Sequence, residues 1–170
     1  MDLKLTMLAV GLSILAACGS QRSGPPPPTL SFEGLPVSGS LADAHRAGFT
    51  DCQGTDAISM RCRRHDVTLR GAGPYEAAVD LAGSDGGGGF DQVTLWHPRD
   101  QYAVYKITDV LEAEGWKTCS TGTETRGDQI VYTRPGARVR VSMDLSYWGK
   151  RRLRVLPPWN TRDQRCQPKS

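Results

Sequence analysis

The sequence predicts an α+β fold in which a short helix followed by an antiparallel meander of three or four strands occurs as a tandem repeat, with two disulfides. Three observations support this prediction. Two matching segments, AHRAGFTDC ending at Cys52 and LEAEGWKTC ending at Cys119, lie 67 residues apart. Alternating apolar and polar residues, typical of half-buried strands, follow each segment. Besides a cysteine near the N-terminus, the chain has an even number of cysteines, as expected of an exported, disulfide-bonded protein.

Each matching segment predicts a helix that ends at a glycine. Ser40, with Asp43 three positions later, is typical of the start of the first helix. Gly48 and Gly115 follow the two helices, where glycine readily adopts the left-handed conformation. The expected inner faces consist of apolar residues, Leu41 and Ala44 in the first helix and Ala103, Ile107, Val110 and Leu111 in the second.

Period-two patterns predict the strands that follow. The first meander is expected at residues 58–63 and 75–81, with shorter candidates at 67–70 and 92–96. The second is expected at 138–145, and its inner face consists of Val139, Val141, Met143 and Leu145, continued by Leu153 and Val155. One helix on a small sheet buries little apolar surface, so the two units either share a core or join into one larger sheet.

The cysteines predict two disulfides but no metal site. Cys52 and Cys62 are close in sequence, which favours pairing them and leaves Cys119 with Cys166, although four cysteines allow three connectivities. The second bridge would hold the C-terminal segment against the second unit. No Cys-x-x-Cys pair occurs. The three histidines, at positions 45, 65 and 97, do not have the spacing of metal ligands.

The N-terminal segment has the features of a secretory signal. After Lys4, residues 5–17 form a run of apolar and small residues that is too short to cross a bilayer as a helix, which takes about 20 residues. The run ends in Leu15, Ala16, Ala17 and Cys18.

These four residues resemble the lipobox of bacterial lipoproteins. The resemblance implies that Cys18 receives a diacylglycerol on its sulfur, becomes the N-terminus after cleavage, and is acylated on its amine. Gly19 stands where an aspartate would favour the inner membrane, so the resemblance implies the periplasmic face of the outer membrane. The expected organisation is a signal peptide (1–17), a lipidated N-terminus and proline-rich tether (18–34), and two units (35–98 and 99–170).

The charge distribution indicates an anion-binding surface. The net charge is +3, and the basic residues are 16 arginines and 5 lysines. Four arginines are expected on the outer face of one hairpin, where they would suit lipid headgroups, lipopolysaccharide or peptidoglycan carboxylates: Arg138, Arg140, Arg152 and Arg154. A face that is only solvated, with Arg152 roughly opposite Asp144 as a cross-strand pair, is favoured over this anion-binding surface.

The sequence contains neither a phosphate-binding motif nor a catalytic serine motif. The glycine-rich run at 83–90 lacks the lysine and the serine or threonine of a phosphate-binding loop, and a flexible connection between strands is expected there. No Gly-x-Ser-x-Gly turn occurs. His65, beside Asp66, is the best acid–base candidate, but a surface or turn histidine is favoured. We therefore expect no catalytic residue, metal or cofactor.

The predicted function is that of a non-enzymatic, lipid-anchored envelope lipoprotein that presents a sheet face to a protein or envelope partner. Binding of an anionic envelope glycan or lipid through the arginine face is the alternative, and an envelope hydrolase is the least favoured. Nucleic acid is not an expected partner. In pattern only, the predicted units resemble the β-lactamase inhibitory protein and the small helix-sheet lipoproteins of outer-membrane assembly, and no motif carries a function over from them.

Overall fold

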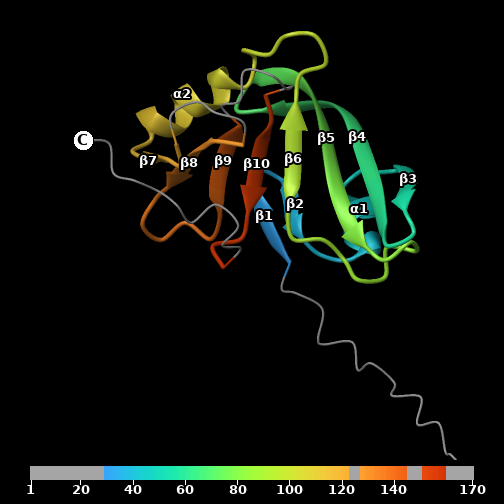
Figure 1. The fold of residues 1–170 in the computed structure, drawn as a ribbon. Coiled ribbons are helices and arrows are strands. Elements are labelled where there is room, and N and C mark those ends of the chain that lie inside the picture. Colours follow the sequence, from blue (N-terminus) through green and yellow to red (C-terminus); the bar gives the residue numbers. More distant parts are fainter. Residues whose placement is uncertain (1–28, 123–126, 145–150, 160–170) are drawn as a thin grey trace, which may run out of the picture.

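The computed structural model describes residues 29–122, 127–144 and 151–159 (Figure 1). These segments contain two short helices, α1 (Leu41–Arg46) and α2 (Tyr105–Ala113). Their strands are β1 (Leu30–Phe32), β2 (Leu35–Ser38), β3 (Asp51–Asp56), β4 (Ser59–Leu69), β5 (Ala72–Ala82), β6 (Val93–Trp96), β7 (Lys117–Ser120), β8 (Gln129–Thr133), β9 (Arg140–Asp144) and β10 (Leu153–Leu156).

Eight of these strands form one antiparallel sheet, in the order β3-β4-β5-β6-β10-β9-β8-β7. The centre of the sheet is the pairing of β6 with β10, where Leu95 lies opposite Leu153. Strands β1 and β2 form a separate hairpin that includes residues 30–34, at the end of the predicted tether. Because β6 and β10 pair, the two runs of strands give one another hydrogen-bonding partners at what would otherwise be exposed edges.

The apolar core lies between one face of this sheet and a layer formed by the helices and the β1–β2 hairpin. In Figure 1, α1 and the hairpin lie behind the sheet, and α2 lies beside the ends of β7, β8 and β9. Val37 of the hairpin, Phe49 after α1, and Ile107 of α2 are fully buried in a single cluster with inward-facing residues of the sheet. The opposite face of the sheet carries the alternate side chains of these strands, some of them exposed and some, such as Ser142, buried.

The two matching sequence segments form helix ends with the same hydrogen bonds. Gly48 and Gly115 have φ of 85° and 82°, the left-handed conformation expected there. The following residues, Phe49 and Trp116, are buried, and each donates its backbone N–H to a carbonyl five residues earlier. Ser40 caps α1 through a reciprocal bond with Asp43, as predicted.

Two predicted strands are one continuous strand in the structure. The segments 58–63 and 67–70 both belong to β4, which pairs with β5 along its length. The register shifts between Arg64 and Val67, and Asp66 in this interval has a φ of 53°. A bulge of this kind interrupts the alternation of inward and outward residues, so the sequence pattern looks like two short strands.

The predicted fold class, an α+β tandem repeat with two disulfides, is wrong. The structure is mostly β, since its helices have only 6 and 9 residues while eight strands form a continuous sheet over a single core. The described residues contain one disulfide, Cys52–Cys62, and Cys166 of the other predicted bridge lies outside them. The physical reason is that a short helix covers too little of a four-stranded sheet to give it a separate core.

The glycine-rich run is the connection from β5 to β6. It is built from hydrogen-bonded turns, including Gly88 N–H to the Ala82 carbonyl. Gly89 has a φ of 70°, and a side chain there would meet the carbonyl oxygen of Gly39 at 2.5 Å. Gly39 and Phe90 exchange two backbone hydrogen bonds at this contact, which joins the loop to the segment before α1.

The N-terminal predictions fall on residues outside the described segments. The signal sequence and Cys18 belong to residues 1–28, so the lipid anchor stays a prediction. In the part of the chain that the structure describes, no helix is long and apolar enough to cross a membrane.

Because the Tyr132 side chain is buried, the folded protein is expected to lose stability at alkaline pH. Burial raises the pKa of Tyr132 from 10.0 to about 12. The unfolded chain therefore releases this proton first, and the stabilisation present below pH 10 is expected to decline as the pH rises from 10 to 12. Urea unfolding at several pH values should show a shallower decline for Tyr132→Phe than for the wild type. Tyr102→Phe, at a side chain that is 64% exposed, is the control and should follow the wild type.

Candidate functional site

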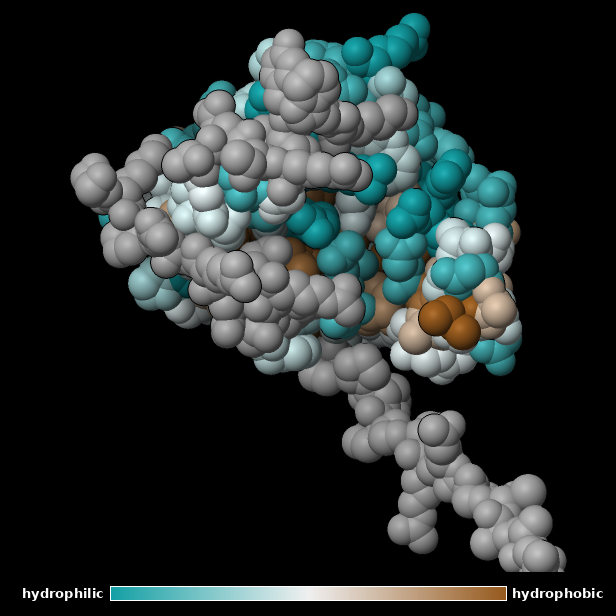
Figure 2. Space-filling model, viewed as in Figure 1, coloured by the Kyte–Doolittle hydropathy of each residue, from teal (hydrophilic) through white to brown (hydrophobic). Residues whose placement is uncertain are grey.

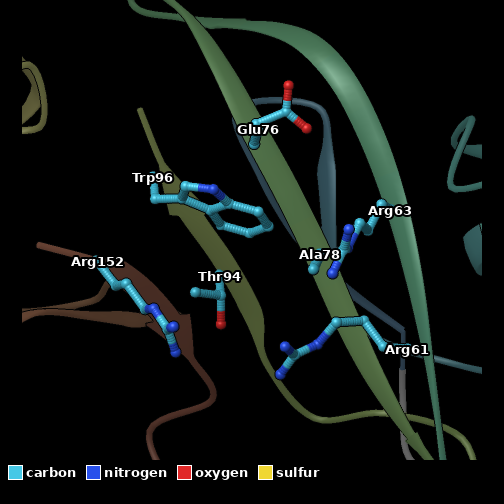
Figure 3. A pocket seen from close by; sticks show the side chains of 7 residues that line it. All are labelled: Arg61, Arg63, Glu76, Ala78, Thr94, Trp96 and Arg152. Atoms are coloured by element: carbon cyan, nitrogen blue, oxygen red, sulfur yellow. The ribbon is translucent and has the colours of Figure 1, made fainter. Parts of the chain in front are cut away.

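A groove of about 300 Å³ crosses the outer face of the sheet, on the side away from the helices (Figure 3). This volume is at the small end of the range for ligand sites, about 300–1,000 Å³, and suits one sugar unit or a short side chain. Its lining residues come from β4, β5, β6 and the position just before β10: Arg61, Arg63, Glu76, Ala78, Thr94, Trp96 and Arg152.

Strand register places these side chains on one face. Arg63 lies opposite Ala78, which lies opposite Thr94, so these three residues form a row across β4, β5 and β6. Glu76 and Trp96 are partners one step along the same strands. Because side chains alternate along a strand, Cys62 between the two arginines of β4 points to the core instead. Ala78 is only 2% exposed, so the longer side chains around it form most of the groove's surface.

The three arginines of the groove differ in how their charge is balanced. Arg61 donates to both carboxylate oxygens of Asp80, at 2.6 and 2.9 Å, and hydrogen bonding to Asp80 raises the pKa of Arg61. Arg63 is half-buried and Arg152 is exposed, and neither forms an ion pair with another residue of the described segments. Among the described residues, the groove therefore has two guanidinium groups without an ion-pair partner, and its lining also includes the carboxylate of Glu76.

The remaining lining residues add one hydroxyl group and one flat apolar surface. Thr94 accepts a hydrogen bond on its hydroxyl oxygen from the Gln92 side-chain amide at 3.1 Å, so its own proton can be donated to a ligand. Trp96 is half-buried, and Figure 3 shows its ring lying between Glu76 and Thr94. In the same view the guanidinium groups of Arg61 and Arg152 point toward the space beside Thr94 from opposite sides.

The surroundings of the groove are hydrophilic. Figure 2 shows polar residues gathered over β4, β5 and β6, in the same view as Figure 1. Arg154 is half-buried on the same face and lies directly opposite Thr94 in the β10–β6 register. Guanidinium groups recognise carboxylate and phosphate oxygens in planar geometry. Chemically, the groove is suited to holding an anionic group beside a flat ring or sugar.

His65 lies at the Glu76 end of the groove and is held between two carboxylates. Its Nδ1 is 2.6 Å from Glu76 Oε2, and its Nε2 is 3.8 Å from Asp51 Oδ2. These residues come from β3, β4 and β5, so the imidazole links the three strands at the edge of the sheet. Both ring nitrogens face protein carboxylates, and this arrangement supports a structural role rather than proton exchange with a ligand.

The four predicted anion-binding arginines are spread over different environments. Arg152 lines the groove and Arg154 lies beside it. Arg138 is exposed just before β9, and Arg140 is buried with only 9% of its surface exposed. The hairpin's alternation indicated the outer face of the sheet, but it did not indicate which part of that face is open.

Six of the seven residues that line the groove were not predicted from the sequence: Arg61, Arg63, Glu76, Ala78, Thr94 and Trp96. The signal for the arginines was present, because both alternate with core residues in the segment SMRCRRH. Trp96 ends a predicted strand, and only the order of the strands brings it near Arg152. Pairing of β6 with β10 could not be deduced from the pattern of either strand.

The Cys52–Cys62 disulfide joins directly opposite residues of β3 and β4, which confirms this predicted pairing. On the core side of the sheet, His45 of α1 places its Nε2 3.4 Å from Cys52 Sγ. The side chains of His45, Cys52 and Cys62 form a cluster in which the imidazole nitrogen and the two sulfurs all lie within 4.8 Å of one another. Cys119 lies on β7, and the proposed pairing with Cys166 involves a residue outside the described segments.

Comparisons with protein-family models, with curated proteins and with solved structures found no match to this chain. The groove and the cluster around His45 are therefore interpreted from their own geometry.

Proposed function

We propose that this chain is a lipid-anchored, non-enzymatic envelope protein that binds an anionic envelope polymer in the groove on its outer sheet face. One observation carries the proposal: Arg63 and Arg152, without ion-pair partners in the described segments, lie in a hollow beside Thr94 and Trp96. Guanidinium and hydroxyl donors would hold carboxylate or phosphate oxygens, and the indole ring would contact a sugar or apolar group.

The fold supports a binding role because the groove is formed by paired strands. Three adjacent strands, hydrogen-bonded to one another, supply all of its lining residues except Arg152, which directly precedes β10. The Cys52–Cys62 disulfide fixes the strand that carries Arg61 and Arg63. A site on rigid strands loses little conformational entropy when a ligand binds. The predicted acyl chains on Cys18 would keep the groove near envelope polymers.

The test is cosedimentation of the purified protein with peptidoglycan sacculi, and in parallel with lipopolysaccharide micelles, at low and high salt. Peptidoglycan offers carboxylates and lipopolysaccharide offers phosphates, so the two probes separate the sources of the anion. Arg63→Gln/Arg152→Gln is expected to weaken binding at least about tenfold, because each charge-assisted hydrogen bond contributes about 1.5–3 kcal/mol. Binding by the wild type should weaken as salt rises.

The matched control is Arg99→Gln/Arg138→Gln. It removes the same charge from two exposed arginines that do not line the groove. This variant should bind nearly as well as the wild type. Equal weakening by both double variants would indicate general attraction to a basic surface and would contradict a specific site, as would unchanged binding by the groove variant.

A further inference from the structure

His45, Cys52 and Cys62 bring two sulfurs and one imidazole together at the β3–β4 side of the sheet. His45 Nε2 is 3.4 Å from Cys52 Sγ, and all three donor atoms lie within 4.8 Å of one another. Thiolate sulfur and imidazole nitrogen are the ligands that Zn²⁺ prefers in proteins. In the disulfide the sulfurs are bonded to each other, so this ligand set becomes available only when the bond is reduced.

The three side chains are positioned by contacts other than the disulfide bond. Cys52 and Cys62 are partners in the β3–β4 register, and the pairs on either side continue the ladder, Asp51 with Arg63 and Gln53 with Arg61. Backbone pairing therefore keeps the two sulfurs adjacent after reduction.

The imidazole is positioned by α1 and by its attachment to the sheet. Ser40 and Asp43 cap the start of the helix. The Arg64 guanidinium of β4 donates to the carbonyl of Ala47, just after the helix, at 2.9 Å. This bond ties the end of α1 that carries His45 to the strand that carries Cys62.

Burial of the cluster suits a metal site with one open position. Cys62 is fully buried, Cys52 is half-buried and His45 is exposed. The apolar core therefore encloses the cluster on the Cys62 side, while solvent reaches it from the His45 side. A tetrahedral ion with three protein ligands keeps its fourth position for water.

We propose that reduction of the Cys52–Cys62 disulfide creates a Zn²⁺ site in which both thiolates and His45 Nε2 are ligands. A dithiol reductant supplies two electrons and two protons, so that two thiols form while the reductant becomes a disulfide. Zinc then displaces the two thiol protons to solvent. Exchange with a disulfide oxidant, which accepts two electrons and two protons to become a dithiol, re-forms the Cys52–Cys62 bond and releases the ion. This site lies on the core side of β4 and does not depend on the groove function proposed above.

The experiment uses the full-length protein, from which a chelator has removed bound metal, and it is carried out without oxygen. One sample is treated with a phosphine, which reduces disulfides to thiols and becomes the phosphine oxide, and the other is left unreduced. Co²⁺ serves as the spectroscopic probe, and Zn²⁺ is then added in competition. The reduced wild type is expected to show thiolate-to-cobalt charge transfer and tetrahedral d–d absorption, and zinc should displace the cobalt. The unreduced protein should show neither. Cys52→Ser/Cys62→Ser retains the other cysteines and gives the baseline for binding by them.

Two histidine variants test whether His45 is a ligand of the zinc ion. His45→Ala should weaken zinc binding by about 100-fold or more, because even loss of a group that only orients a ligand costs about 10–100-fold. His65→Ala, which removes the nearby imidazole that faces Asp51, should leave the zinc affinity unchanged.

Three results would overturn the proposal. The first is metal binding by the reduced wild type no stronger than that of the double serine variant. The second is an equal affinity in His45→Ala and the wild type. The third is loss of the far-ultraviolet circular dichroism of the sheet on reduction without any metal uptake, which would mean that the strands do not hold the ligands in place.

Discussion

Replacing Leu95 with alanine is expected to lower the free energy of unfolding by about 2–5 kcal/mol, the usual cost of deleting a buried leucine side chain. Leu95 is fully buried and lies on β6 at the centre of the sheet. Its partners are Ala77 on β5 and Leu153 on β10, so its side chain packs where the two runs of strands meet. Urea unfolding followed by circular dichroism measures the change.

The same experiment distinguishes a single core from two separate ones. Because one cluster of buried residues extends across the sheet, both halves should unfold in one transition, in the wild type and in Leu95→Ala. The control, Ile58→Ala, truncates a side chain that is 76% exposed and should change the stability by less than about 0.5 kcal/mol. Two separate transitions in Leu95→Ala, with one half still folded, would contradict a shared core.

Cys18→Ser is expected to remove the protein from the membrane fraction almost completely. Serine cannot carry the thioether-linked diacylglycerol that the lipobox implies, and each buried methylene of an acyl chain contributes about 0.8 kcal/mol of membrane affinity. Cell fractionation with immunodetection, together with mass spectrometry of the N-terminal peptide, measures the result.

Gly19→Asp is the matched variant for the anchor. It retains the cysteine and should still be acylated, but aspartate at this position favours the inner membrane in the lipoproteins that the N-terminus resembles. Separation of the two membranes on a sucrose gradient should therefore show the wild type in the outer membrane and the variant in the inner. Membrane attachment of Cys18→Ser at the wild-type level, or an unmodified Cys18 in the purified native protein, would contradict a lipid anchor.

Local features of the chain could be predicted because they depend on neighbouring residues. The capping pair Ser40 and Asp43, and the left-handed Gly48 and Gly115, depend on contacts within a few positions of the sequence. The Cys52–Cys62 bridge also joins residues of one hairpin. Strands β3, β7 and β8 and the β1–β2 hairpin were not predicted; β3 is mostly exposed and polar, so it lacks the alternation that marks a half-buried strand.

The candidate site was only partly predictable, because a local pattern gives the face on which a side chain lies but not the strands that lie beside it. Alternation indicated that Arg152 and Arg154 face outward, as they do. It equally indicated Arg140, which is buried, because alternation specifies a face of a strand and not what lies over that face. Grouping Arg63 with Trp96 and Arg152 requires four strands in a given order, which no local pattern encodes.

By itself, the sequence determined the C-terminal ends of the helices, half of the described strands, one disulfide and the expectation of a lipid anchor, since each depends on short-range chemistry. The tertiary structure alone decided that β6 pairs with β10, and therefore that both runs of strands form one eight-stranded sheet with a shared core and a groove across its outer face. Hydrogen bonding between strands is available to any backbone, so the choice of partner comes from the burial of apolar surface by the whole chain. The groove follows from that choice of partners, whereas the sulfur–imidazole cluster follows from the local β3–β4 hairpin and the attachment of α1 to β4.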